Sequence, residues 1–127
     1  MSRLVNAFLF CLIVFISCGT PGKPVLELSS YTFNYDTIFS ERGYDGYVII
    51  KNSGNAALVI KHLYPDCACT NASTTKSVIP PGDTSKLTFH LNTYNKYEGD
   101  NINTICIEAN TDSMVHVLWI NYFIKDH

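Results

Sequence analysis

The sequence has no surplus of basic residues. Nine lysines and arginines stand against eleven aspartates and glutamates in 127 residues, which gives a formal net charge of −2. Nucleic-acid binding depends on clustered positive charge, because it is driven by the release of counterions from phosphates. Charged residues make up only 16% of the chain and hydrophobic residues 46%, whereas a disordered chain has the opposite profile. We therefore expect a globular protein with a single folded domain and no nucleic-acid partner.

Motifs that carry catalysis are also missing. The sequence contains no nucleophile elbow, no glycine-rich phosphate loop and no H-E-x-x-H string. The glutamates are scattered over different segments, which gives no support to paired-carboxylate chemistry. We therefore expect a protein that is not an enzyme and needs no cofactor.

The apolar run near the start of the chain is too short to span a bilayer, which takes roughly 20 residues. Ala7–Ile16 is ten residues long, the length of the hydrophobic region of a secretory signal peptide. Arg3 precedes it, and Ser17-Cys18-Gly19 follows it. This order resembles the lipobox of bacterial lipoproteins, in which cleavage precedes the cysteine and its thiol takes a diacylglycerol. The resemblance implies that Cys18 is the lipid anchor, since several acyl chains hold a protein on a membrane stably.

The expected organisation is a signal peptide at 1–17, a lipid-anchored tether at 18–24 and a folded domain at 25–127. The tether is rich in glycine and proline and reads as a linker. No acidic run follows Cys18, which favours an anchor on the periplasmic side of the outer membrane over surface export. An ordinary signal peptide that ends near a cysteine, or an uncleaved apolar arm, is the alternative.

Short alternating segments separated by turn residues predict an all-β protein, an antiparallel sandwich of about seven strands. Asn52-Ser53-Gly54-Asn55 contains residues that accept positive φ and predicts a hairpin between the segments that flank it. Pro80-Pro81-Gly82-Asp83 has the Pro-Gly order of a type II turn. A second hairpin is predicted between the last two segments. The predicted strands are 25–28, 31–33, 47–51, 58–64, 86–91, 103–109 and 115–124.

Five motifs follow one another along the chain. They are Phe33-x-Tyr35-Asp36-Thr37-Ile38, Lys51-Asn52-Ser53-Gly54-Asn55-x-x-Leu58-Val59-Ile60, Asp66-Cys67-Ala68-Cys69-Thr70, Ile79-Pro80-Pro81-Gly82-Asp83 and Ile105-x-Ile107-x-Ala109-Asn110. Together they resemble the bacterial family known as domain of unknown function 1573, from about Phe33 to Ile124. The resemblance implies an immunoglobulin-like sandwich in the envelope of a Bacteroidetes-type bacterium, distantly similar to hydin and major-sperm-protein modules. It implies no activity.

Cys67 and Cys69 form the one pair with obvious chemistry, because residues two apart on an extended segment point to the same side. Both thiols can ligate copper(I) or zinc, with His62, Asp66 or Cys106 as further ligands. They can also form a labile disulfide, since a bridge across a single residue is strained. A third interpretation is that they are small, semi-buried packing residues. These alternatives stay open.

Trp119 and Phe123 are the best candidates for partner contact, because they alternate with apolar residues that point the other way. An aromatic patch on an outer face marks an interface. The sequence thus predicts a module that binds or scaffolds a protein or glycan by a sheet face or an edge strand. The alternative is that a loop or the amino-terminal segment covers the patch. Tyr94 and Tyr97 lie in a loop that suits sugar stacking or a solvated turn.

Four further residues carry smaller predictions. Thr37 and Ser113 each follow an aspartate and precede an aliphatic residue, which resembles the O-glycosylation sites of Bacteroidetes envelope proteins. Cys106 is expected on the opposite face from its two isoleucine neighbours. His90 shares the outward face of its segment and is expected to be solvated.

Overall fold

The computed structural model describes residues 21–126, which form nine β-strands and no helix. The predicted signal segment, Cys18 and the first part of the tether lie outside these residues. The all-β expectation is confirmed. Because the described residues contain no helix, none of them belongs to a helix that could cross a membrane. The strands are β1 (Leu26–Leu28), β2 (Thr32–Phe39), β3 (Gly43–Asn52), β4 (Leu58–Pro65), β5 (Thr70–Thr74), β6 (Val78–Ile79), β7 (Thr84–Asn92), β8 (Gly99–Ala109) and β9 (Val115–Lys125).

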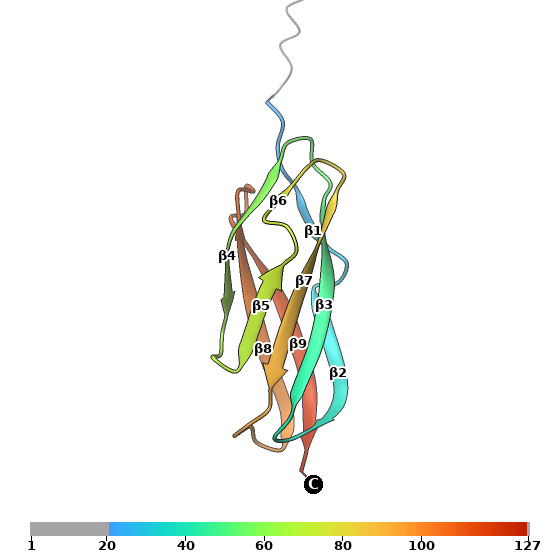
Figure 1. Ribbon diagram of the computed structural model, residues 1–127, viewed down its shortest axis with the longest axis vertical. Coiled ribbons are helices and arrows are strands. Elements are labelled where there is room, and N and C mark those ends of the chain that lie inside the picture. Colours follow the sequence, from blue (N-terminus) through green and yellow to red (C-terminus); the bar gives the residue numbers. More distant parts are fainter. Residues whose placement is uncertain (1–20, 127) are drawn as a thin grey trace, which may run out of the picture.

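The strands form two sheets that pack face to face along the long axis of the molecule (Figure 1). One sheet has the order β1-β3-β7-β5 and the other β2-β9-β8-β4-β6. The pairings within the described residues are antiparallel, except that β2 runs parallel to β9. The predicted sandwich is therefore confirmed, with one parallel pair that the sequence did not predict.

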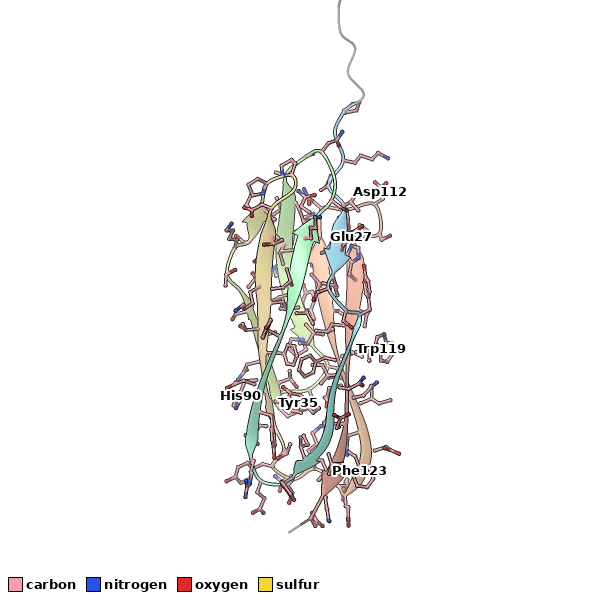
Figure 2. All side chains as sticks on the ribbon, turned by 90° about the vertical axis from the view of Figure 1, so that its right-hand side faces the viewer. Glu27, Tyr35, His90, Asp112, Trp119 and Phe123 are labelled. Atoms are coloured by element: carbon pink, nitrogen blue, oxygen red, sulfur yellow. A yellow bond between two sulfur atoms is a disulfide. The ribbon has the colours of Figure 1, made fainter. Side chains whose placement is uncertain are left out.

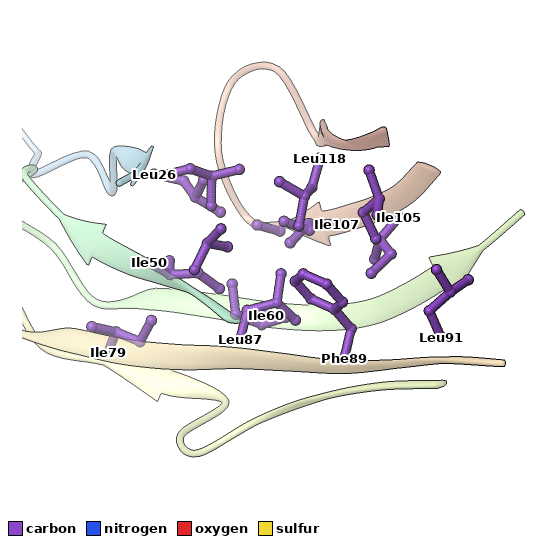
Figure 3. Close-up of a cluster of buried hydrophobic side chains, with 14 of the residues drawn as sticks. Leu26, Ile50, Ile60, Ile79, Leu87, Phe89, Leu91, Ile105, Ile107 and Leu118 are labelled. Atoms are coloured by element: carbon purple, nitrogen blue, oxygen red, sulfur yellow. The ribbon is translucent and has the colours of Figure 1, made fainter. Parts of the chain in front are cut away.

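Alternation along the strands builds the core between the sheets. Leu87, Phe89 and Leu91 of β7 are buried, as their spacing predicts, and they face Ile105 and Ile107 of β8 across the sandwich (Figure 3). Successive side chains of a strand point to opposite faces, so one face of each sheet is apolar and the other meets water. Full burial of each such side chain stabilises the fold by about 1.5–3 kcal/mol.

The hairpin predicted between the segments that form β3 and β4 is wrong. β3 pairs with β1 and β7, whereas β4 pairs with β6 and β8 in the other sheet. The chain crosses between the sheets at Asn52, whose side chain is fully buried. Its amide nitrogen donates to the carbonyls of Ala56 (2.7 Å) and Ile79 (2.9 Å), and its amide oxygen accepts from the N–H of Gly54 (3.0 Å). These bonds hold a crossover, which local turn chemistry does not reveal.

Gly82 and Gly54 are required for different structural reasons. Gly82 has φ of 77°, and the N–H of Asp83 donates to the Pro80 carbonyl at 3.0 Å, which confirms the type II turn. Gly54 lies in the segment expected to use positive φ, but it does not. A Cβ there would lie 2.1 Å from the Lys23 carbonyl oxygen and 2.6 Å from the Val25 nitrogen. Gly54 is thus required by close approach of the tether.

The sequence missed β5 and β6 and most of β2. β5 reads Thr-Asn-Ala-Ser-Thr, which has no apolar alternation, and it becomes a strand by pairing along β7. β2 has a register shift against β9 between Asn34 and Thr37. Asp36, inside that shift, has φ of 60°, a conformation that aspartate tolerates better than most residues. The last two strands form the predicted hairpin, paired from Gly99↔Ile124 to Glu108↔Val115.

Candidate functional site

An exposed apolar surface covers the outer side of the β8–β9 hairpin and the neighbouring β4. We call it the apolar face and define it by its exposed members, Tyr64, Ile102, Val115, Trp119 and Phe123. Alternation places them outward, because Leu118, Ile120, Tyr122 and Ile124 of β9 point into the core. Trp119 is 48% exposed and Phe123 40%. Among the described residues, no loop covers these two rings, and Figure 2 shows both on the same side of the molecule.

Trp119 lies near the middle of the five-stranded sheet. Its Cα partners are Thr104 on β8 and Thr32 on β2, and its N–H donates to the Tyr31 carbonyl at 2.9 Å. Pairing on both sides fixes the strand, while the small threonine side chains leave the indole standing above its neighbours. A rigid aromatic side chain loses little entropy on binding, which suits it to contact a partner.

A hollow of about 450 Å³ lies at the Phe123 end of the apolar face. We call it the Phe123 hollow. Ile102 and Phe123 give it apolar walls, and the exposed carboxylates of Asp36 and Asp100 line it, with no basic side chain among its described lining residues. The β2 bulge brings Asp36 to this position. Two carboxylates beside an aromatic ring form a surface complementary to a cation.

The Cys67–Cys69 pair lies in the connection between β4 and β5, and the two sulfurs form a disulfide. The Cys69 N–H donates to the Cys67 sulfur at 3.0 Å. The amide of Asn103, a buried β8 residue, lies 3.7 Å from the Cys69 sulfur and donates to the Asp66 carboxylate at 2.9 Å. The bridge is thus tied to a polar network that reaches into the sandwich.

Tyr122 completes that network. Its phenol is buried and donates to the Asn103 side-chain carbonyl. Burial, and the nearby Asp66 carboxylate, raise the pKa of Tyr122 to about 12, so the phenol stays a donor through the physiological range. The network orients the disulfide segment.

The structure does not bring His62 to the cysteine pair. Its Nδ1 lies 3.1 Å from a Glu108 carboxylate oxygen, and its ring stacks on Tyr64 with centroids 5.6 Å apart. The Tyr64 phenol donates to the same carboxylate oxygen at 3.2 Å. Residues 21–126 contain no group of three or more His, Cys, Asp or Glu side chains placed to hold a metal ion.

The remaining predicted residues are found as follows. Cys106 is a half-buried free thiol on the opposite face from the buried Ile105 and Ile107. Thr37 on β2 and Ser113 in the β8–β9 turn are both exposed, which leaves their hydroxyls accessible for modification. Cys18 lies outside the described residues.

The sequence did not predict one group of residues that the fold brings together. His90 is half exposed, as expected, but its Nδ1 lies 2.7 Å from the Asp45 carboxylate. The two residues are 45 positions apart and meet only because β3 pairs with β7. Nothing local in the sequence signals such a pair. Together with Tyr47, Asn71, Lys86 and others they line a second hollow on the four-stranded sheet.

Comparison with known proteins identifies the family. The family described as protein of unknown function (DUF1573) matches residues 26–124. The chain belongs to this family. The resemblance seen in the motifs is thereby confirmed, and DUF1573 covers almost all of the described sandwich. No curated protein matches the chain.

Solved structures show that this DUF1573 member has an immunoglobulin-like fold. A protein of unknown function from Porphyromonas gingivalis W83 is similar with a TM-score of 0.70 and 14% identity, over 87% of this chain and 51% of that one. This chain therefore spans about half the length of that relative. The ASH/PapD-like domain 7 of human CEP192 gives 0.60 and 13%, over 83% and 87%. A major-sperm-protein family member from C. elegans, WR4, gives 0.51 and 9%, over 79% and 97%. At these identities the likeness establishes the fold alone.

Proposed function

We propose that this protein is a non-catalytic binding module of the bacterial cell envelope, and that it docks a protein partner on the apolar face. One observation carries the proposal. Trp119, Phe123 and Ile102 are exposed together on one sheet face, where a solvated strand would carry polar residues. Large exposed apolar side chains gathered on one face mark interaction sites. A glycan partner at the same face is the other form of the hypothesis.

The Phe123 hollow narrows the chemistry of the partner. Asp36 and Asp100 stand beside the Phe123 ring, so a lysine or arginine of the partner would find both a carboxylate and an aromatic face there. We therefore expect a protein segment that is apolar at its centre and basic at one end. The carboxylates would speed association and set the register, while the aromatic rings would supply most of the affinity.

Site-directed photo-crosslinking in the native host tests the docking face. A photoreactive phenylalanine analogue is placed at Trp119 or Phe123, and at Tyr97 as a control, since Tyr97 is 88% exposed in the β7–β8 connection. We expect one discrete crosslinked species from the first two positions and none from Tyr97. Identical products from all three positions, or no product from Trp119 and Phe123, would overturn the proposal.

The partner captured in this way is then tested for affinity. We expect Trp119→Ser to weaken binding at least about tenfold, as loss of an interface anchor does. Asp36→Asn with Asp100→Asn should slow association and reduce its salt dependence, with less effect on dissociation. Unchanged affinity in Trp119→Ser would show that the crosslink came from proximity alone.

Lipid anchoring at Cys18 is part of the proposal and is supported by the sequence order around that residue. The anchor would hold the sandwich on the periplasmic side of the outer membrane, through the tether that begins the described chain. Cys18→Ser should move the protein from the membrane fraction to the soluble fraction. A wild-type protein that fractionates as soluble, with an unmodified Cys18 in its mass spectrum, would contradict it.

A thiol-redox role of Cys67 and Cys69 is the second candidate. The disulfide between them favours it over ligation of copper or zinc, which needs both thiols reduced. In the redox form, a dithiol reductant gives two electrons and two protons to the bridge, which opens to two thiols. Equilibration in glutathione buffers, in a Cys106→Ser background, should then give a two-electron midpoint within the range of thiol–disulfide oxidoreductases. A bridge that stays closed across that range, and no stoichiometric metal uptake after forced reduction, would remove this candidate.

A further inference from the structure

We propose that this protein also binds a saccharide, in a hollow on the outer face of the four-stranded sheet. The hollow has a volume of about 450 Å³ and lies over β7, the strand between β3 and β5. We call it the β7 hollow. Figure 2 shows His90, at its rim, on the opposite side of the molecule from Trp119. The site is therefore separate from the apolar face, and its test is independent of the proposed protein partner.

One row of residues, paired side by side across β3, β7 and β5, supplies an aromatic ring and two hydroxyls. Tyr47 on β3 pairs with Thr88 on β7, which pairs with Ser73 on β5. All three side chains point outward. The Tyr47 ring is 55% exposed, and the Lys86 ammonium lies 4.7 Å from its centroid. The Ser73 and Thr88 hydroxyl oxygens are 3.1 Å apart. This row thus combines an apolar ring surface with polar groups beside it.

The next row of outward-facing residues across the same three strands supplies a carboxylate and an amide. Asp45 pairs with His90, and His90 with Asn71. The His90 imidazole lies over Gly43, where an added Cβ would be 2.6 Å from the ring. Its Nδ1 lies 2.7 Å from one Asp45 oxygen, while the Asp45 side chain stays 88% exposed. His90 is therefore a positioning residue, and Asp45 and the exposed Asn71 are the groups that meet a ligand.

This set of groups matches the chemistry of a sugar ring. A pyranose presents C–H groups on its face and hydroxyls around its edge. The face can lie on the Tyr47 ring, while a carboxylate and an amide can each bond two neighbouring hydroxyls. The Lys86 ammonium adds a donor, which suits a hydroxyl or the acid group of a uronic sugar.

The strand order argues against a peptide in the same place. Peptides commonly bind sheets by adding a strand at a free edge. β7 has no free edge, because β3 pairs on one side and β5 on the other. A ligand over β7 must be held by side chains alone. Those that line the hollow include the Tyr47 and Phe89 rings, together with hydroxyl, amide, imidazole, ammonium and carboxylate groups.

The walls are also held before any ligand arrives. Asp45 is held by His90, Thr88 by Ser73, and the Tyr47 ring by Lys86. Contacts already made in the free protein lower the entropy cost of ordering side chains on binding. A shallow site of this kind can then bind an oligosaccharide with a Kd between about 1 μM and 1 mM.

Calorimetric titration of the natively processed full chain in detergent micelles tests the proposal. The probes are cellohexaose, chitohexaose and mannohexaose as neutral oligosaccharides, and an oligogalacturonate as an acidic one. We expect saturable binding of at least one probe. Tyr47→Ala and Asp45→Ala should each weaken it at least about tenfold, while Tyr47→Phe, which keeps the ring, should bind nearly as wild type does.

Matched controls separate this site from the rest of the molecule. Lys51→Ala changes an exposed β3 residue outside the hollow, and Trp119→Ser changes the apolar face, so both should bind as wild type does. If Lys86→Gln weakens binding of the oligogalacturonate alone, the acid group is recognised by Lys86; if it weakens the neutral probes as well, Lys86 acts on hydroxyls or through the Tyr47 ring. Either result supports the site. No binding of any probe up to about 10 mM, or equal binding by folded Tyr47→Ala, would overturn the proposal.

Discussion

The phenol of Tyr122 on β9 donates a hydrogen bond to the side-chain carbonyl of Asn103 on β8, and both side chains are buried in the sandwich. Their Cα atoms are not paired in register, since Asn103 faces Ile120 across the ladder. The bond runs diagonally along the inner face. It links the last strand to the Asp66 carboxylate and, through the Asn103 amide, to the disulfide segment.

Tyr122→Phe is expected to lower the free energy of unfolding by about 1–2 kcal/mol, because it removes a buried hydrogen bond and leaves the Asn103 carbonyl poorly satisfied. Among the described residues, the Lys96 ammonium also reaches that oxygen, at the longer distance of 3.4 Å. Chemical denaturation measures the change. Tyr31→Phe is the control, because Tyr31 is half exposed, and it should stay within about 0.5 kcal/mol of wild type. Equal effects of the two substitutions would show that the buried bond contributes little.

Gly46→Ala is expected to destabilise the protein by about 1–3 kcal/mol through overpacking. The new Cβ would lie 2.5 Å from the ring of Phe89 and 2.9 Å from the Tyr35 hydroxyl, and Phe89 is buried and contacts Phe33 edge-on. Thermal unfolding measures the change. A melting temperature at or above that of wild type would show that the Phe89 and Tyr35 side chains can move aside to accept the methyl group.

Gly43→Ala is the matched substitution on the same strand. Its Cβ would meet only the half-exposed imidazole of His90, which can turn away into solvent. Replacing glycine also reduces the entropy of the unfolded chain, by about 0.4–1 kcal/mol. We expect Gly43→Ala to leave the free energy of unfolding unchanged or to raise it slightly. The difference from Gly46→Ala then shows that the buried Phe89 ring cannot move aside, whereas the exposed His90 ring can.

His116 is expected to give the protein a pH-dependent stability below neutrality. Burial lowers the pKa of His116 from its ordinary value of 6.5, and its Nε2 lies 2.7 Å from the Thr111 hydroxyl. Between the lowered pKa and 6.5 the unfolded chain binds more protons than the folded one. The free energy of unfolding should therefore fall as the pH drops below about 6.5 and level off below the folded pKa. His116→Gln should flatten this part of the curve, and an unchanged slope would assign it to other groups.

The disulfide predicts a definite peptide mass. Trypsin releases residues 62–76 as one peptide that holds both Cys67 and Cys69. Digested without reduction, it should be two hydrogens lighter than the dithiol and resist alkylation, while Cys106 is alkylated after unfolding. Replacing both cysteines by serine should cost only about 1–2 kcal/mol, because the closed loop is very short. Alkylation of both before reduction would mean that the pair is free in the native protein.

The sequence alone determined the features that rest on local chemistry. Alternation along 86–91 predicted which side chains face the core, because neighbouring residues of a strand point to opposite sides. Along 115–124 it separated Trp119 and Phe123 from Leu118, Ile120, Tyr122 and Ile124, but it left open whether another segment covers the two rings. The Pro80-Pro81-Gly82-Asp83 turn followed from proline fixing one φ and glycine accepting the other sign. The family resemblance likewise came from motifs readable in order.

Tertiary structure alone decided which strands lie beside each other. β3 and β4 carry the pattern of a hairpin, yet the buried side chain of Asn52 sends them to different sheets. Thr70–Thr74 has no strand pattern and becomes one by pairing with β7. The two hollows also arise in this way. Asp36 reaches Phe123, and Asp45 reaches His90, across long stretches of chain. A local pattern specifies the face of a side chain, but the energy of pairing and burial in the whole fold selects its neighbours.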